Sequence, residues 1–379
     1  MKKIRKYIYL LLIFSYVSFT SCEDFALGEK FLQKPPSGDV TIDTIFSTAE
    51  YARRVLWYAY SKLPYGFSTG YNNSTSMRVG SIESLTDLAQ SYVGYAGADK
   101  LYYPGLYNAG SEDESGGEAH ATKYNMYARD PWKGIRHAWV FINNVDRVPD
   151  MTAEEKLRLK AEAKITIAVQ YSEMLRHYGA LPIVDHAIMP EEMGLPERAT
   201  LQQTVDFITR LLDEAIACKE LPWALPEDDL SNESGRMTGA AAMGLKLRVL
   251  LFVASPLFNS DEPYFPGEAS DKLMTWFGGK DAAKAGEDFF KSWKQGGFYE
   301  LVQKETATKN TIRQAFQDAY YTRGTTESLI SVRRHFRTND IRTLLQSLRW
   351  GAWCPTKECF DLFPMILIGI ILFIRKILL

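Results

Sequence analysis

The sequence predicts a mainly α-helical protein in which helix pairs form the scaffold, long aromatic-rich loops join them, and a few short strands are secondary. Helix-capping residues recur at Thr152, Thr200 and Thr238, and a further helix is expected from Lys280, so successive starts are 48, 38 and 42 residues apart. This spacing is too irregular for a strict repeat but fits elaborated helix-turn-helix pairs. The 379 residues are 46% hydrophobic and 24% charged, which is enough apolar material for a sizeable core.

Charge and cysteine content exclude several classes of partner and cofactor. Lys and Arg number 44 against 46 Asp and Glu, and this balance gives no reason to expect nucleic acid. The four cysteines, Cys22, Cys218, Cys354 and Cys359, are too few and too scattered for a disulfide framework or a four-thiolate zinc site. The five histidines lack metal-ligand spacing. We therefore expect no metal, no other cofactor and no nucleic-acid partner.

The first residues have the order of a secretion signal. Lys2, Lys3, Arg5 and Lys6 precede an apolar run, 7–19, that is too short to span a bilayer. The sequence Phe19-Thr20-Ser21-Cys22 resembles a bacterial lipobox, although Phe19 stands where Leu is commonest. We expect 1–21 to be a lipoprotein signal peptide and Cys22 to be the lipidated N-terminus. The alternative is ordinary secretion with an incidental cysteine.

The remaining chain divides into a tether, a domain and a tail. Residues 22–44 are polar and include Pro35-Pro36-Ser37-Gly38, which is typical of a tether. The folded domain is expected over 45–363. The tail, 364–379, contains an apolar run at 365–374 that is too short to span a membrane. A tail anchor is the alternative; we expect instead that this segment is not the native continuation of the domain.

Helix signals occur in sequence along the domain. Ser47-x-x-Glu50 predicts a helix over 51–63, stopped at Pro64. Asp130-Pro131 predicts a second helix, whose Trp132, Ile135, Trp139 and Ile142 share one stripe and are expected to be core.

The later helices have clear starts and stops. Thr152-x-x-Glu155 opens the longest, which is expected to stop at Tyr178-Gly179. Thr200-x-x-Gln203 opens the next, with Leu201, Val205, Ile208 and Leu212 facing inward. Thr238 opens an apolar helix to Ala254, and 280–295 is the last clear helix, ended by Gly296-Gly297. A short strand is expected over 327–333.

Several of these segments together resemble one known family. They are Trp132-x-x-Ile135 with Asn143-Asn144, Ala161-Glu162-Ala163 through Tyr178-Gly179-Ala180-Leu181-Pro182, Arg198-Ala199-Thr200 through Leu221-Pro222, Gly235-Arg236-Met237-Thr238 through Ala254-Ser255-Pro256-Leu257-Phe258-Asn259, Glu327-Ser328-Leu329-Ile330, and Pro355-Thr356-x-Glu358 with Asp361 and Phe363. In order and spacing they resemble the RagB/SusD family of outer-membrane nutrient-binding lipoproteins, over roughly 49–363. Family members continue beyond this point, whereas the chain is apolar from Met365; a frameshift, a truncated gene or a fragmentary gene model would each explain the difference.

The resemblance implies a function. It implies a surface lipoprotein, SusD-like and TPR-like in fold, that binds a nutrient, most simply an oligosaccharide, and delivers it to a SusC-like TonB-dependent transporter. It also implies lipid anchoring to the cell outer membrane, and Glu23-Asp24 after Cys22 resembles the surface-display signal of Bacteroidota lipoproteins. Starch, another plant or host glycan, and peptide all stay open as ligands.

Glycan-binding members stack aromatic faces on sugar rings beside polar side chains. Tyr102, Tyr103 and Tyr107 with Asn108 offer this mixture on the long segment between Pro64 and Arg129, and Trp276 offers it between Asn259 and Gly279. Each of these rings could instead pack beneath its own loop. They are our expected ligand-binding residues.

Two other classes were weighed. A secreted glycan hydrolase needs two carboxylates placed on either side of a bond, whereas Glu112-Asp113-Glu114 are adjacent and lack a positioned partner. No nucleophile elbow, H-E-x-x-H or P-loop motif occurs. We therefore expect no catalytic residues. A peptide-binding protein of helical repeats is the other alternative, which the long aromatic loops favour less.

Overall fold

The computed structural model describes residues 41–64, 86–90, 103–106, 130–188, 192, 194, 196–225, 233–259, 279–304, 306, 308–332 and 354–362. Over these residues the protein is mainly helical, as predicted. A short helix, α3 (Ile42–Ile45), belongs to an N-terminal unit that ends at Ile45. The described residues from Phe46 onward belong to a second unit.

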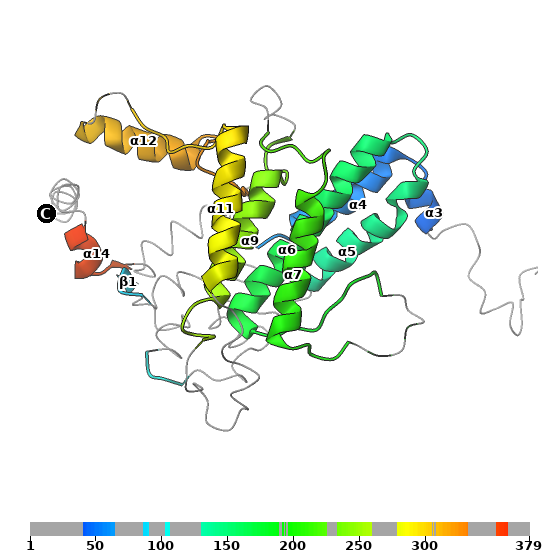
Figure 1. Ribbon diagram of the computed structural model, residues 1–379, viewed down its shortest axis with the longest axis horizontal. Helices are drawn as coiled ribbons and strands as arrows, with labels where there is room; N and C mark the ends of the chain where they lie inside the picture. The colour runs from blue at the N-terminus through cyan, green and yellow to red at the C-terminus, as the bar shows by residue number, and fades with distance from the viewer. Residues whose placement is uncertain are drawn as a thin grey trace, which may run out of the picture. The chain divides into compact units, whose positions relative to one another are not determined.

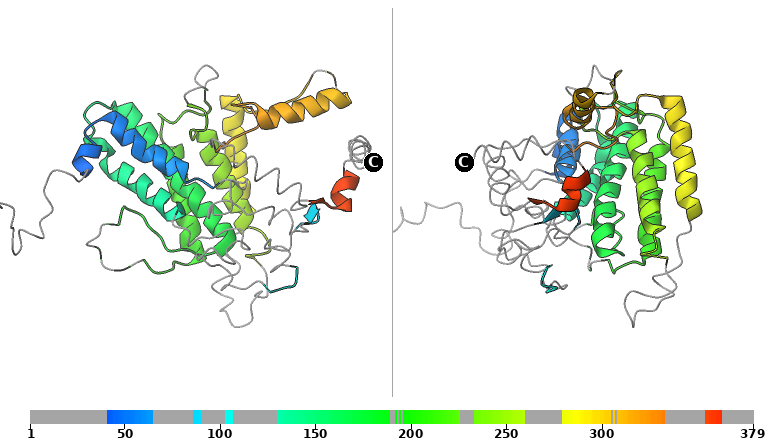
Figure 2. Two further views of the ribbon diagram at one scale, coloured as in Figure 1. Left: turned by 180° about the vertical axis from the view of Figure 1, so that it is seen from behind. Right: turned by 90° about the vertical axis from the view of Figure 1, so that its left-hand side faces the viewer.

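Six helices of this second unit form its scaffold, with a 3-10 turn, η5 (Val145–Arg147), after the second. They are α4 (Ala49–Ser61), α5 (Asp130–Asn144), α6 (Ala153–Tyr178), α7 (Leu201–Ile216), α9 (Gly239–Val253) and α11 (Gly279–Gly296). Each packs mainly against the helix before it and the helix after it in this series. Figure 1 and the two further views in Figure 2 show α6, α7, α9 and α11 standing side by side. The expected scaffold of helix pairs is confirmed.

Threonine caps begin most of these helices, because a threonine hydroxyl accepts a backbone N–H that the first turn leaves unpaired. The hydroxyls of Thr152, Thr200 and Thr238 each accept from the backbone N–H three residues later, as predicted. At the first helix the predicted bounds, 51–63, lie two residues too late at each end. Its cap is Thr48 rather than Ser47, and α4 begins at Ala49.

The core follows the predicted stripes. On α5, Ile135 and Trp139 are buried while Trp132 and Ile142 are half-buried. The indole Nε1 of Trp139 donates to the carbonyl of Val184, 2.8 Å away, so its one polar atom is satisfied. All four predicted inward residues of α7 are buried: Leu201, Val205, Ile208 and Leu212.

The chain after α6 is held in place by Tyr171. Gly179 ends the helix at φ 69°, a conformation that glycine adopts without steric cost. The buried Tyr171 hydroxyl then donates to the carbonyl of Pro182 at 2.9 Å and accepts from the N–H of Val184 at 2.8 Å. Its ring meets that of Phe207 on α7 edge-on at 4.9 Å. One side chain of α6 therefore fixes both the neighbouring helix and the irregular segment between them.

A buried ionic cluster joins α4, α6 and the approach to α9. The Glu162 side chain is 0% exposed. Its carboxylate accepts from the Tyr60 hydroxyl at 2.8 Å, from Arg158 Nε at 3.0 Å, and from Arg236 Nε and Nη2 at 3.0 and 2.5 Å. Both arginines also donate to Glu233. Two cations thus face two anions, which keeps the buried charge balanced.

The buried ionic cluster also forms a hydrogen bond with the backbone. The Tyr60 hydroxyl accepts from the N–H of Met237, 3.0 Å away, directly before the cap of α9. Burial, followed by the nearby charge of Glu162, raises the pKa of Tyr60 well above its ordinary value. Burial alone would lower the pKa of Arg236, but the two carboxylates raise it on balance. Both groups therefore keep their protons at neutral pH.

Trp223 packs beneath the end of α11. Its indole Nε1 donates to the carbonyl of Gly297 at 3.0 Å, and its ring lies 6.0 Å from that of Tyr299. A Cβ added at Gly296 would fall 2.5 Å from two atoms of the Trp223 ring. Only glycine fits at that position without displacing the indole.

Two features after α11 differ from the sequence expectation. A further helix, α12 (Lys309–Tyr321), follows, with a capping box between Thr308 and Thr311. The expected strand over 327–333 is wrong for its described part, because residues 327–332 are irregular. Their polar groups are used elsewhere: the Glu327 carboxylate accepts from the N–H of Val302.

The described strands are two residues long. β1 (Ala89–Gln90) pairs antiparallel with β2 (Cys354–Pro355), and α14 (Lys357–Leu362) follows directly. Within the described ranges, no helix combines the length and apolarity needed to cross a membrane. No group of three or more potential metal ligands occurs in the same ranges.

Removing the charge of Glu162 should destabilise the protein strongly. Glu162→Gln leaves two buried arginines facing a single carboxylate, and breaking a buried ion pair of this kind costs about 3–5 kcal/mol. Urea unfolding followed by circular dichroism measures the loss. Glu220→Gln, at an exposed glutamate, is the control; equal stability of the two variants would contradict the central role of the cluster.

Gly296→Ala should also lower stability, by about 1–3 kcal/mol, because the added methyl group forces the Trp223 ring out of its place. Gly279→Ala is matched to it, since it lies at the other end of α11 and its Cβ would meet nothing within 4 Å. Thermal melts of both variants, with tryptophan fluorescence as the readout, test this. A Gly296→Ala protein with the same melting temperature as the wild type would show that the Trp223 indole has room to move.

Candidate functional site

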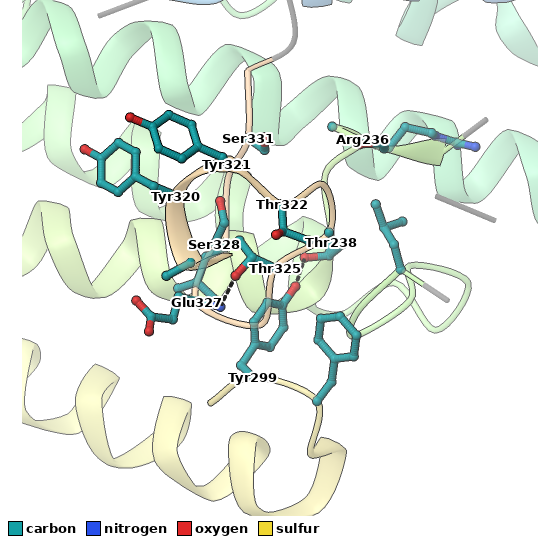
Figure 3. A pocket seen from close by; sticks show the side chains of 17 residues that line it. Arg236, Thr238, Tyr299, Tyr320, Tyr321, Thr322, Thr325, Glu327, Ser328 and Ser331 are labelled. Atoms are coloured by element: carbon teal, nitrogen blue, oxygen red, sulfur yellow. Dashed lines mark hydrogen bonds between the residues drawn. The ribbon is translucent and has the colours of Figure 1, made fainter. Parts of the chain in front are cut away.

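A tyrosine-lined pocket lies where four separate parts of the second unit meet (Figure 3). Its volume is about 310 Å³. These parts are Leu225, 234–238 before α9, 298–299 after α11, and 319–331 at and beyond the end of α12. The pocket takes its aromatic and polar character from Tyr299, Tyr320, Tyr321, Thr322, Thr325, Glu327 and Ser328.

Hydrogen bonds to the chain after α11 fix the segment beyond α12. Gly324, at φ 67°, lies in the turn that follows the helix. The Thr326 carbonyl accepts from the Glu300 N–H at 3.2 Å, and the Thr326 hydroxyl donates to the Glu300 carbonyl at 2.9 Å. The Glu327 carboxylate accepts from the N–H of Val302 at 2.7 Å. The polar wall of the pocket is therefore tied to the chain that precedes α12.

Two exposed tyrosines form one side of the pocket. Tyr320 and Tyr321, the last residues of α12, are 70% and 78% exposed. Figure 3 shows them next to one another, on the same side of the pocket as Glu327. The Tyr320 ring stacks on that of Phe316 one turn earlier, with centroids 5.6 Å apart and planes 26° apart. Large aromatic faces with this much exposure are available to a ligand.

Tyr299 and Phe298 form another side. The Tyr299 hydroxyl lies 3.4 Å from the hydroxyl of Thr238, the cap of α9. Burial raises the pKa of Tyr299, and its hydrogen bond with Thr238 opposes the rise only in part. Phe298 has φ 68°, after Gly297 at φ 59°. This pair of left-handed residues reverses the chain at the end of α11 and brings both rings to the pocket.

The charged groups at the pocket differ in their surroundings. Arg236 lines it, yet all three of its guanidinium nitrogens donate to the carboxylates of Glu162 and Glu233. Figure 3 shows this side chain extending away from the labelled hydroxyl groups. Glu327 is exposed and forms no ion pair with the described residues. The arrangement can bind and orient a polar ligand with a flat apolar face.

Of the site residues expected from the sequence, Tyr103 alone lies within the described ranges. Cys22, Tyr102, Tyr107, Asn108 and Trp276 fall outside the described residues. Tyr103 lies in a turn over 103–106, is 43% exposed, and is not among the residues that line the pocket.

Sequence reasoning missed the pocket because it missed α12. The available signal was Tyr320-Tyr321-Thr322 before Gly324, which places two aromatic rings next to hydroxyl groups at a turn. The same combination of aromatic rings and polar side chains led to the prediction of Tyr102 and its neighbours as ligand-binding residues.

Comparison with known proteins shows similarity in fold. Protein-family models give no match, and curated proteins give none. Among solved structures, the chain is similar to a protein named BT4246, with a TM-score of 0.58, 21% identity, and 77% of this chain and 51% of that chain covered.

Two further structures carry SusD in their descriptions. One is a SusD-like protein from Bacteroides fragilis (TM-score 0.53, 19% identity, 80% of this chain and 48% of that chain). The other is a SusD homolog from Bacteroides thetaiotaomicron (TM-score 0.52, 16% identity, 77% and 56%). The chain spans about half the length of the solved structures it matches. The resemblance seen in the sequence motifs is confirmed in the backbone, and the protein has a SusD-like fold.

Proposed function

We propose that the protein is a non-catalytic, cell-surface lipoprotein that binds an oligosaccharide and delivers it to a SusC-like TonB-dependent transporter. The SusD-like fold supports the class of protein, together with the family motifs in the sequence. The observation that carries the proposal is the pocket, whose lining includes the exposed Tyr320 and Tyr321 together with hydroxyl groups and a carboxylate.

A binding site for a sugar needs both a flat aromatic surface and polar groups. One face of a pyranose ring is rich in C–H groups and packs on a flat aromatic ring, while its edge carries hydroxyls that donate and accept hydrogen bonds. Tyr321 offers such a ring at 78% exposure. Thr322, Thr325 and Ser328 offer hydroxyl partners, and Glu327 offers a charged acceptor, which forms stronger hydrogen bonds than a neutral one.

The carboxylates support binding over hydrolysis. Most glycoside hydrolases place two carboxyl groups about 5–10 Å apart across the scissile bond. Among the described residues that line the pocket, Glu327 is the one carboxylate. A glycan hydrolase at this pocket would lack its second group.

The aromatic loops stay part of the proposal. Tyr102, Tyr103, Tyr107, Asn108 and Trp276 are proposed as a second set of ligand contacts. The exposed ring of Tyr103 is compatible with that role.

Membrane attachment is proposed through lipid on Cys22. A basic, apolar and small-residue sequence precedes this cysteine. A single acyl chain anchors a protein only marginally, whereas a cysteine carrying several acyl chains would hold it stably. A palmitate-type anchor on the outer membrane would place the domain close to its transporter.

Tyr321→Ala and Tyr320→Ala should each weaken oligosaccharide binding by about 1–3 kcal/mol, because an aromatic anchor dominates an interface of this kind. Calorimetric titration against a panel of oligosaccharides measures the change, and product analysis of the same mixtures tests for hydrolysis. Tyr51→Ala is the matched control, an exposed tyrosine of α4 outside the pocket. Undiminished affinity in both pocket variants, or released sugar products, would overturn the proposal.

Cys22→Ala should abolish lipidation and move the protein from the membrane fraction to the soluble fraction of the cell. Mass spectrometry of the N-terminal peptide from the native protein should show an acylated Cys22 at the mature N-terminus. Cys218→Ala, at a half-buried cysteine inside the domain, is the control. An N-terminal peptide that retains residues 1–21, or that carries an unmodified Cys22, would refute this assignment.

A further inference from the structure

The charge balance of the tyrosine-lined pocket restricts the class of glycan it can accept. Among the described residues that line it, two have side chains of a charged type, Arg236 and Glu327. Their availability to a ligand differs sharply. The net effect on an entering group therefore depends on which of the two charges is already neutralised.

The positive charge is already neutralised. Arg236 donates through Nε and Nη2 to Glu162 and through Nη1 to Glu233, and its side chain is only 14% exposed. The guanidinium also lies over the Trp57 ring, 5.4 Å from its centroid, which covers another part of it. A ligand anion would have to compete with two carboxylates that are fixed in place. Arg236 therefore contributes structure to the pocket and little positive potential.

The negative charge is not neutralised. One oxygen of Glu327 accepts a backbone N–H, from Val302, and the side chain has no cationic partner within the described part of the chain. Lys304 lines a neighbouring groove together with Glu327, but its ammonium is 2.6 Å from Asp318. Arg323 is exposed to solvent and does not line the pocket.

We propose that this pocket selects neutral oligosaccharides and discriminates against acidic ones, such as those built from uronic acids. The inference rests on the proposed function and names its ligand class. Sugar hydroxyls can donate to the second oxygen of Glu327, whereas a ligand carboxylate would lose its hydration, meet no available cation among the described lining residues and face a like charge. Two like charges within a few ångströms near a protein surface repel by about 1–4 kcal/mol, so the affinities of neutral and acidic ligands should differ by at least about fivefold.

The test uses pairs of ligands that differ only in charge. Oligogalacturonides and hyaluronan oligosaccharides of defined length are the acidic probes, and their carboxyl-reduced forms, in which each carboxylate has become a hydroxymethyl group, are the neutral probes. Neutral oligosaccharides of other linkages complete the panel. Calorimetric titration at low salt gives each affinity. We expect each carboxyl-reduced probe that binds to do so at least about fivefold more tightly than its acidic parent.

Glu327→Gln tests the cause. The amide oxygen can still accept from Val302, so the segment should keep its conformation, but the charge is gone. The difference in affinity between acidic and neutral probes should narrow to within about threefold, because the repulsion between the two carboxylates is removed. Glu287→Gln, at an exposed glutamate of α11 away from the pocket lining, is the matched control and should leave the gap unchanged.

The outcomes separate the inference from the function on which it rests. Acidic probes that bind as tightly as their reduced forms, or a gap that Glu327→Gln leaves unchanged, would overturn the charge selection while the oligosaccharide function stands. Binding of no probe in the panel, or binding that survives Tyr321→Ala and Tyr320→Ala unchanged, would overturn the function at this pocket and the inference with it.

Discussion

Burying a carboxylate away from water destabilises a folded protein unless cations and hydrogen-bond donors surround it. Glu162 meets this requirement with Tyr60 from α4, Arg158 from its own helix and Arg236 from the segment before α9. Parts of the chain that are far apart in sequence converge on this one side chain. Since residues 234–238 also line the tyrosine-lined pocket, the cluster that fixes the helices fixes one wall of the pocket as well.

Local signals made most of the scaffold predictable. A threonine cap at Thr152, Thr200 or Thr238 needs only the three residues that follow it, and so its effect can be read from a short stretch of sequence. The first cap was harder, because Ser47 and Thr48 are both competent. A tertiary contact is made at this helix start: the carboxylate of Asp150 accepts from the N–H of Ala49, 2.6 Å away.

The errors lie where distant segments decide the local structure. The helix α12 was missed because its capping box closes with Thr311, where the common pattern has Glu or Gln. The segment from Glu327 has the residues of a strand, but its polar groups bond to the chain after α11 and so no strand forms. The pocket combines four parts of the chain that are distant from one another in sequence. Each stretch contributes only part of the pocket, so its sequence alone does not show that the parts converge.

Phe298 occupies a backbone conformation that disfavours any side chain. A residue other than glycine at positive φ costs about 1–2 kcal/mol, and Gly297 beside it already provides one left-handed turn without that cost. A glycine or an asparagine at position 298 would relieve the backbone but would remove the ring that lies 5.0 Å from Tyr299. Selection for thermal stability alone would therefore tend to replace this phenylalanine and empty one side of the pocket. Directed evolution of a more thermostable variant would need a screen for ligand binding if Phe298 is to be retained.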